Sequence, residues 1–167
     1  MTGVTIRRVE ERDIAALARM VTALAAHHGD AALTGEAALA RDCLGKEPWL
    51  QVWVAEAEAG GLVGYVACQR RVQMQVGRRG ADLHHLYVDP DRRGQGVGAA
   101  LVAEALVWAG EEACHWMSVG TEPGNNAAQA FYMALGFRPL EIEARRFLRP
   151  VEARGRAGEA LGSRAKA

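Results

Sequence analysis

The sequence has 167 residues, half of them hydrophobic, which suits a single domain with a sizeable buried core. Its 20 basic and 20 acidic residues give a net charge of zero. This balance excludes the strongly positive surface that a nucleic-acid-binding protein needs. We therefore expect the partner to be a small molecule or a protein terminus.

The three cysteines, Cys43, Cys68 and Cys114, are widely spaced and form no C-x-x-C pair. An odd number at such spacing favours buried thiols in a reducing compartment over disulfides or zinc ligands. The first residues lack the apolar core of a signal peptide, and no run of about 20 apolar residues is present to span a bilayer. We expect a cytoplasmic protein that does not bind membranes.

The N-terminal part of the sequence predicts a strand followed by two helices. Residues Val4–Val9 form the strand, and apolar residues at helical spacing indicate an amphipathic helix over Asp13–His27. Asp13 is expected at the N-cap or in the first turn of this helix. Thr34 is expected to cap a second helix over Glu36–Leu44.

Two adjacent histidines, His27 and His28, end the first of these helices, and Gly29 follows them. A helix end favours histidine and glycine, whereas adjacent side chains on a helix point apart. A helix terminus is therefore a better interpretation than a metal site. A contribution of this loop to the functional site is left open.

Two strands in the middle of the chain are joined by a tight turn. They cover Trp49–Glu56 and Leu62–Cys68, and Gly60-Gly61 makes the turn between them. The next segment, Gln69–Ala81, is more polar and contains four arginines. It either extends the hairpin or forms a loop over the functional site, and its arginines are expected to lie on a solvated surface.

The following part of the sequence predicts a strand, a glycine-rich loop, a helix and a second strand. The first strand covers Leu83–Val88, and an alanine- and leucine-rich helix covers about Gly98–Ala109. Gly110 is expected to interrupt that helix. A short strand over Cys114–Thr121 is expected to lie parallel to the first strand, because a crossover helix joins parallel neighbours.

The C-terminal part predicts one more helix and the closing strands. The helix is capped by Asn125 or Asn126 and runs to Leu135, where a glycine follows. Strands are expected at Phe137–Pro139 and Ile142–Leu148. Beyond them the chain contains scarcely any bulky apolar residues. We therefore expect a domain over residues 1–148 and a mobile tail over residues 149–167.

A glycine-rich segment separates the strand ending at Val88 from the next helix. It consists of Arg93, Gly94, Gln95, Gly96, Val97 and Gly98. Glycines let the backbone approach a ligand, and the first turn of a helix offers free N–H groups, so a phosphate group fits there. A triphosphate P-loop is excluded because Ala99, and not Lys, follows the last glycine. A dinucleotide fingerprint is excluded because Glu122, the acidic residue at the right distance, sits in a turn.

This segment resembles motif A of the GCN5-related N-acetyltransferase (GNAT) superfamily, whose pyrophosphate loop reads Gln/Arg-x-x-Gly-x-Gly/Ala. A second block resembles motif B and consists of Asn125, Ala128, Phe131, Tyr132, Gly136 and Phe137. The resemblance extends more loosely from about Thr5 to about Leu148. It implies an α+β (α/β) fold with a mixed, mostly antiparallel twisted sheet and helices on both faces.

The resemblance implies acetyl-CoA as the acetyl donor, and no metal. The pyrophosphate is expected on the backbone N–H groups of the glycine-rich segment, where Arg93 adds positive charge. In relatives, the strands equivalent to Leu83–Val88 and Trp116–Gly120 splay apart, and the pantetheine arm pairs with the first. The residues implied to contact the donor are Leu86, Tyr87, Val88, Arg93, Gly94, Gln95, Gly96, Val97, Gly98, Asn125, Ala128 and Phe131. A helix cap is a comparable interpretation of Asn125, and close helix packing is the alternative for the glycines.

Tyr132 matches the family tyrosine that lies beside the sulfur atom. Its hydroxyl group can protonate the departing thiolate there. A core aromatic side chain is the competing interpretation.

A base must also remove a proton from the acceptor amine. Alternation along the strand predicts Asp82, His84, Leu86 and Val88 on one face and Leu83, His85 and Tyr87 on the other. Only one of the adjacent histidines is therefore expected on a given face. His84 is the first candidate for the base and Asp82 the second, because the ordinary histidine pKa of about 6.5 suits the task. Filling the sheet face is an equally good interpretation of the histidines.

The expected reaction is direct transfer of an acetyl group from acetyl-CoA to a primary amine of a small molecule. The spacing resembles the diamine acetyltransferase branch, in which a Glu-Asp pair stands at the place of His84-His85. This departure weakens the case for a polyamine acceptor. Acetylation of protein N-termini or lysines, and a catalytically silent acyl-CoA sensor, are the alternatives; the presence of Tyr132 favours an enzyme. A homodimer is an assembly that the sequence leaves open.

Overall fold

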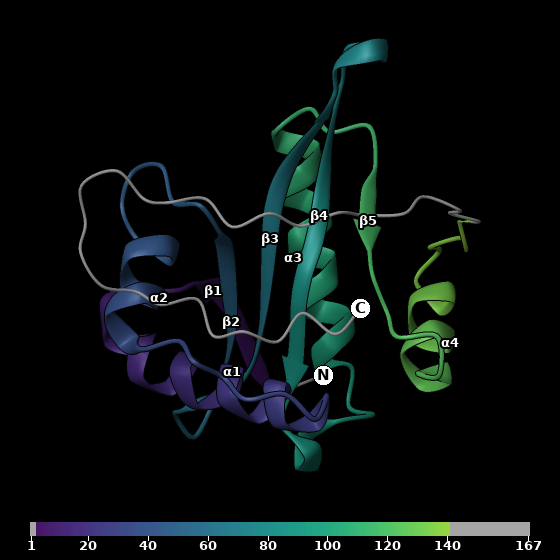
Figure 1. Ribbon diagram of the computed structural model, residues 1–167. Coiled ribbons are helices and arrows are strands. Elements are labelled where there is room, and N and C mark those ends of the chain that lie inside the picture. The colour runs from purple at the N-terminus through teal and green to yellow at the C-terminus, as the bar shows by residue number, and fades with distance from the viewer. Residues whose placement is uncertain (1–2, 141–167) are drawn as a thin grey trace. The chain divides into compact units, whose positions relative to one another are not determined.

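The computed structural model describes residues 3–140. The chain divides into two compact units after Asn125, and each is described by itself. The elements of the first unit are β1 (Val4–Arg8), α1 (Ile14–His27), α2 (Glu36–Cys43), β2 (Gln51–Ala57), β3 (Leu62–Gln73), β4 (Arg78–Val88), α3 (Val97–Glu111) and β5 (Met117–Val119), and the second unit carries α4 (Asn126–Ala134) (Figure 1).

The strands of the first unit form one five-stranded sheet in the order β1-β2-β3-β4-β5. The pairs from β1 to β4 are antiparallel, whereas β5 is parallel to β4. The predicted parallel neighbour is therefore present, joined by the crossover helix α3. Its pairing is short, because it extends only from Ala81, opposite Met117, to Leu83, opposite Val119.

Side chains of the central strands alternate between helices on the two faces of the sheet. Val52 and Val54 of β2 belong to a buried cluster with Leu17 of α1. The residue between them, Trp53, lies on the other face, where its ring is 5.6 Å from the ring of Trp108 on α3. The expected fold, a mostly antiparallel sheet with helices on both faces, is therefore confirmed (Figure 1).

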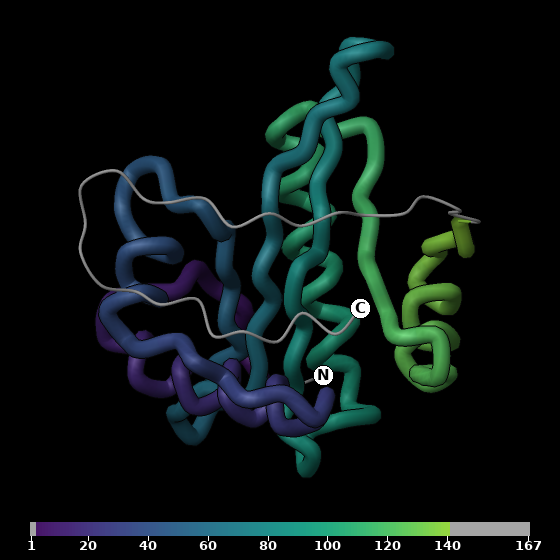
Figure 2. The backbone as a smooth tube through the Cα atoms, viewed as in Figure 1, coloured from purple at the N-terminus to yellow at the C-terminus, as the bar shows by residue number. Residues whose placement is uncertain are grey.

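Strands β3 and β4 continue past the end of β2 as a two-stranded hairpin. The pairing of β2 with β3 stops at Gln51, opposite Cys68, whereas β3 and β4 stay paired as far as Gln73 and Arg78. The turn between them consists of a short 3-10 helix, Met74–Val76, and Gly77, which has a φ of 62°. Figure 2 shows this hairpin projecting beyond the other strands of the sheet. The segment therefore does not extend the predicted hairpin of β2 and β3 and forms no loop; it continues β3 and pairs with β4.

Two predicted helix boundaries are wrong. Thr34 does not cap α2, because the N-cap is the next residue, Gly35, and Thr34 lies one position outside the helix end. Gly110 does not interrupt α3, which continues to Glu111. Trp108 is buried in the last turn of α3. Its packing against the sheet outweighs the roughly 1 kcal/mol that a glycine costs in a helix.

Helix α4 begins directly after Asn125 and ends at Ala134, one residue before the predicted end. Gly136, with a φ of 90°, follows in the left-handed conformation. The N–H of Phe137 donates a hydrogen bond of 3.1 Å to the carbonyl of Tyr132. This bond closes the end of α4 in the way that the glycine predicted.

The strand predicted at Phe137–Pro139 is absent, because these residues have irregular backbone. A proline cannot donate to a strand ladder, which disfavours a strand at this position. The predicted strand Ile142–Leu148, the domain boundary after it and the tail over residues 149–167 lie outside the described residues.

Candidate active site

An extra residue, His84, interrupts the regular pairing of β4. On the neighbouring strand β3, Ala67 lies opposite His85 and the next residue, Cys68, lies opposite Leu83. His84 therefore has no partner in the register, which is the arrangement of a β-bulge. The register is continuous on both sides of this point.

The bulge changes which side chains of β4 share a face. Tyr87 lies opposite Tyr65, and both belong to the buried cluster beneath α1. Ala67 belongs to the same cluster, so its partner His85 lies on this face. Asp82 lies opposite Gln69, which is two residues beyond Ala67 and hence on the same face.

The predicted alternation is therefore wrong at the histidines. The rings of His84 and His85 stack with their centroids 4.3 Å apart and their planes 8° apart. Both histidines thus lie side by side, and Asp82 shares the face of His85. A period of two predicts opposite faces for adjacent residues, but the additional residue of the bulge resets the period.

His85 is the more enclosed of the two histidines. Its Nδ1 lies 3.1 Å from the hydroxyl oxygen of Tyr65, which is 1% exposed. Burial, together with the neighbouring His84 and His28, lowers the pKa of His85 to about 4. His85 is therefore neutral at physiological pH, while His84 is exposed to solvent.

Asp82 is engaged at the junction of β4 and β5. The Ser118 hydroxyl donates a hydrogen bond of 2.6 Å to Asp82 Oδ1. The guanidinium of Arg71 lies 4.0 Å from the same carboxylate oxygen. The carboxylate of Asp82 therefore joins neighbouring strands, and these two contacts compete with a role as a base.

Beyond this junction, the described residues give β4 no partner strand on its outer side. The last pair of β5 with β4 is Val119 with Leu83. The following residues of β4, from His84 to Val88, include the predicted donor contacts Leu86, Tyr87 and Val88. The described register gives them no β5 partner, so their outward backbone groups are open to an extended ligand.

Helix α3 begins in the glycine-rich segment that follows β4. Gly96 occupies the N-cap with a φ of 83°, a left-handed conformation that glycine adopts without strain. Among the described residues no side chain caps this helix end, and its first turn contains no acidic residue. The free N–H groups and the positive end of the helix dipole therefore fit a phosphate group.

Two side chains shape the glycine-rich segment. Arg93 Nε donates a hydrogen bond of 2.9 Å to the carbonyl oxygen of Val88, at the end of β4. Gln95 Nε2 donates one of 2.8 Å to the carbonyl oxygen of Asp91. The bond to Val88 uses only one of the five N–H donors of the Arg93 guanidinium.

The residues of the second block lie in α4 or close to its two ends; Asn125 is the last residue of the first unit, and the others belong to the second unit. Asn125 directly precedes the helix, which is the position of an N-cap, and Ala128 lies in its first turn. Tyr132 is buried, with its ring 5.1 Å from Phe131 and 5.5 Å from Phe137. The catalytic role of Tyr132 stays a prediction.

Sequence reasoning missed the bulge and the contact between Tyr65 and His85. Tyr65 has no sequence feature that sets it apart from other aromatic strand residues. Its contact depends on the register of β3 with β4, which one sequence does not display. The adjacent histidines are the only sequence signal at this place, and alternation along a strand does not predict the bulge between them and β3.

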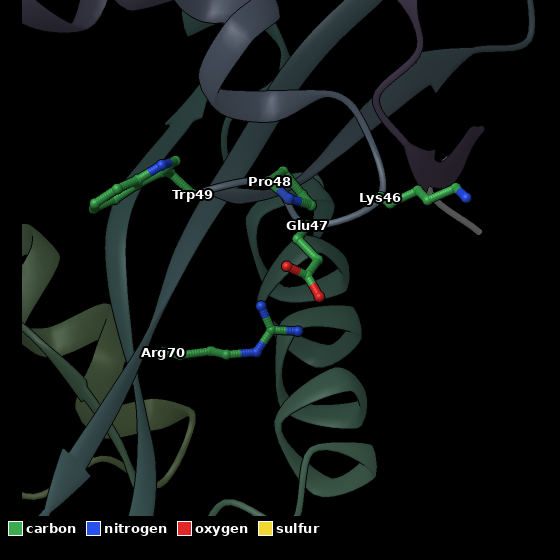
Figure 3. Close-up of a pocket in the computed structure, with 5 residues that line it drawn as sticks. All are labelled: Lys46, Glu47, Pro48, Trp49 and Arg70. Atoms are coloured by element: carbon green, nitrogen blue, oxygen red, sulfur yellow. The ribbon is translucent and has the colours of Figure 1, made fainter.

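A surface cavity of about 280 Å³ lies elsewhere in the first unit. It is lined by Lys46, Glu47, Pro48, Trp49 and Arg70 (Figure 3). None of the predicted site residues lines it. Arg70 is already paired with Glu112 through hydrogen bonds of 3.0 and 2.6 Å.

Within residues 3–140, no three His, Cys, Asp or Glu side chains are grouped so that they could hold a metal ion. In the same part of the chain, no helix combines the length and the apolar character needed to cross a membrane.

The sequence pattern of the acetyltransferase (GNAT) family matches residues 17–137. The chain belongs to this family. It is an acetyltransferase of the class that uses acetyl-CoA as a cosubstrate. The matched range contains the bulge, the glycine-rich segment and α4.

Individual relatives agree with this assignment. The chain is 29% identical to a thialysine N-epsilon-acetyltransferase of Sus scrofa over 149 residues, which cover 84% of this chain and 87% of that protein. It is 30% identical over 104 residues to an uncharacterized N-acetyltransferase of Methanocaldococcus jannaschii. The second match covers 56% of this chain and 46% of the archaeal protein. The chain therefore spans less than half the length of that relative.

A solved structure shows the same fold. It is an aminoglycoside acetyltransferase from an uncultured soil metagenomic sample, in complex with sisomicin. It matches with a TM-score of 0.70 and 18% identity, over 90% of this chain and 97% of that one. At 18% identity, the similarity between this chain and the solved structure concerns the fold alone.

Proposed function

We propose that this chain transfers the acetyl group of acetyl-CoA directly to a primary amine of a small molecule. The observation that carries the proposal is the continuity of β4 with α3. Within residues 3–140, the edge of β4 from His84 to Val88 has no β5 partner, and it leads to a helix N-terminus at Gly96 that no side chain caps. An extended thioester arm suits the first part, and a pyrophosphate suits the second.

The donor is proposed to bind mainly through backbone groups. N–H groups of the segment Arg93–Gly98 bind the pyrophosphate, and the Arg93 guanidinium adds charge. A backbone N–H near Tyr87 or Val88 donates a hydrogen bond to the thioester carbonyl. Such a donor stabilises the oxyanion that develops during acyl transfer.

The proposed chemistry requires one base and one acid. His84 accepts the proton from the acceptor amine, whose nitrogen then forms a bond to the acetyl carbon as the carbon–sulfur bond breaks. Tyr132 donates a proton to the departing thiolate, which leaves as free coenzyme A. The second proton, which the nitrogen loses as it becomes an amide, restores the Tyr132 hydroxyl, and His84 releases its proton to solvent. The exposure of His84 supports its role, whereas the bonds of Asp82 to Ser118 and Arg71 make that carboxylate the second candidate.

A small-molecule acceptor is supported by the relatives. One of them is named for thialysine, which is a small amine. This name does not identify the acceptor of this chain.

The experiment that tests this function is an acetylation screen in which the release of free coenzyme A thiol is measured. The panel contains amino acids, diamines, aminoglycosides, and peptides with a free N-terminus or lysine. The proposal predicts thiol release with at least one small amine, together with an acetylated product of the expected mass. Release with peptides alone favours a protein acetyltransferase. Binding of acetyl-CoA without release favours a silent sensor.

A further inference from the structure

The hydroxyl group of Tyr65 fixes the position of a proton on His85. Tyr65 is 1% exposed, and the partner of its hydroxyl among the described residues is His85 Nδ1, at 3.1 Å. If Nδ1 carried the proton and donated it to Tyr65, the hydroxyl hydrogen would have no acceptor. A buried donor without a partner is unfavourable. Tyr65 therefore donates to Nδ1, and neutral His85 carries its proton on Nε2.

With its proton on Nε2, His85 is not suited to act as the base. The lone pair of Nδ1 accepts the hydrogen bond from Tyr65, and Nε2 presents an N–H group. His85 is thus a hydrogen-bond donor rather than a proton acceptor. Burial and the neighbouring histidines keep its pKa at about 4, so the ring remains this donor throughout the physiological range.

The charges near His85 also limit the kind of ligand that fits. The groups that act on it are His84 from β4 and His28 from the end of α1, together with Tyr65 from β3. Asp82 lies on the same face, where Ser118 and Arg71 both contact its Oδ1 atom. Among the described residues, the groups that act on His85 include no carboxylate, so the surroundings of this ring do not favour a polycation.

We propose that His85 binds an oxygen of the acetyl acceptor through Nε2–H, and that this acceptor is a primary amine that also carries a carboxylate, as a free amino acid does. Tyr65 is then a positioning residue, because it acts through His85. The inference rests on the proposed function. It adds the class of acceptor and a division of roles between the adjacent histidines, in which His84 takes the proton and His85 recognises the acceptor.

The test compares pairs of acceptors that differ only in the carboxylate. Lysine is matched with cadaverine, and ornithine with putrescine, and kcat and KM are measured for each. A hydrogen bond to a charged group is expected to favour the amino acid over the diamine by about tenfold to a hundredfold in kcat/KM. This preference is expected mainly in KM, because the carboxylate does not react.

Variants identify the residue that carries the preference. In the His85→Leu variant, the ratio of kcat/KM for the amino acid to kcat/KM for the matched diamine should fall close to one. The His85→Gln variant should retain part of the preference, because the glutamine amide can still donate a hydrogen bond. Tyr65→Phe should lower the ratio less than His85→Leu does. The double variant Tyr65→Phe/His85→Leu removes both partners and provides a folded comparison if His85→Leu alone is unstable.

Two results overturn the inference alone: equal use of the two members of each pair by the wild type, and an unchanged ratio in the His85→Leu or double variant. Acetylation confined to amines without a carboxylate overturns it as well. If no amine is acetylated at all, the proposed function fails, and this inference fails with it.

Discussion

His84 and His85 are neighbours in the sequence but differ in their surroundings. His84 is exposed, and His85 is hydrogen-bonded to a buried tyrosine. Their stacked rings are a consequence of the bulge. The accessible ring of His84 therefore stacks on the ring of His85, whose proton position is fixed by Tyr65.

The first prediction concerns the base. His84→Ala should lower kcat/KM near neutral pH by about a hundredfold or more, because general-base catalysis contributes that much. It should also remove the acidic limb of the pH–rate profile, which the base produces as it becomes protonated. His85 cannot produce a limb near neutrality, because its pKa is about 4 and its ring is neutral above that pH. Asp82→Asn is the matched comparison. An acidic limb that neither variant alters contradicts both candidates.

The second prediction concerns Tyr132, which is buried next to Phe131 and Phe137. Tyr132→Phe keeps the ring and removes the hydroxyl. It should lower kcat by about a hundredfold if the hydroxyl protonates the thiolate, with little change in the affinity for acetyl-CoA measured by calorimetry. Unchanged turnover would show that Tyr132 is only a core aromatic residue.

At the scale of elements, the C-terminus of α3 contains a strained residue. Ala113 has a φ of 56°, and Cys114 N–H donates a hydrogen bond of 2.8 Å to the carbonyl of Ala109. This is the helix ending that normally contains glycine in the left-handed position. The free energy of unfolding therefore depends on which residue stands at position 113.

We predict that Ala113→Gly raises the free energy of unfolding by about 0.5 kcal/mol, since relief of the left-handed strain exceeds the entropy cost of glycine. Ala113→Val should lower it by about 1 kcal/mol or more, because a β-branched residue tolerates this conformation least. Urea denaturation of both variants measures the difference. Equal stability of the glycine and valine variants contradicts the predicted strain.

The elements of this chain were predictable where local patterns determine them. The crossover helix α3, the turn at Gly60-Gly61 and the apolar face of α1 all follow from local spacing and from glycines. The glycine-rich segment was also identified from its residues. The bulge at His84 was not, because pairing with β3 determines the register, and one sequence shows no cross-strand partner.

Tertiary packing explains the other differences. Gly110 remains helical because Trp108 and Ala109, which precede it, are buried. Strand β3 continues past its predicted end because β4 stays paired with it. Neither effect has a local signal. The sequence therefore predicts which elements exist more reliably than where they end and which face each side chain occupies.

At the scale of the whole molecule, a buried ion pair should make the free energy of unfolding depend on pH in the acidic range. Arg7 donates two hydrogen bonds to Asp13, at 2.6 and 2.9 Å, and Asp13 is 5% exposed. The hydrogen bonds from Arg7 lower the pKa of Asp13 below its ordinary value of 3.8. The folded state therefore favours the charged carboxylate, and this stabilisation is present above pH 3.8 and lost as the pH falls through the folded-state pKa.

Asp13→Asn should lower the free energy of unfolding at pH 7 by about 2 kcal/mol, because it weakens hydrogen bonds to a charged group. The difference from the wild type should shrink below about pH 4, where the native carboxylate becomes protonated. Thermal and urea unfolding between pH 2 and 7 measure this. Asp42→Asn is the control, because Asp42 pairs with its exposed neighbour Arg41 and should cost about 0.5 kcal/mol or less. A pH-independent effect of Asp13→Asn contradicts the account.

The most direct test of the central claim is calorimetric titration of the protein with acetyl-CoA. The wild type should bind one equivalent with a dissociation constant in the micromolar range. Gly96→Ala and Arg93→Ala should each weaken binding by about tenfold or more, because they alter the start of α3 and remove a cation.

Gly77→Ala is the matched control. Gly77 also has a positive φ, of 62°, but lies at the tip of the β3–β4 hairpin with open space around it. This variant should bind acetyl-CoA as the wild type does. Absence of binding by the folded wild type, or equal weakening by all three variants, would contradict the claim that the stretch from β4 to α3 holds the acetyl donor.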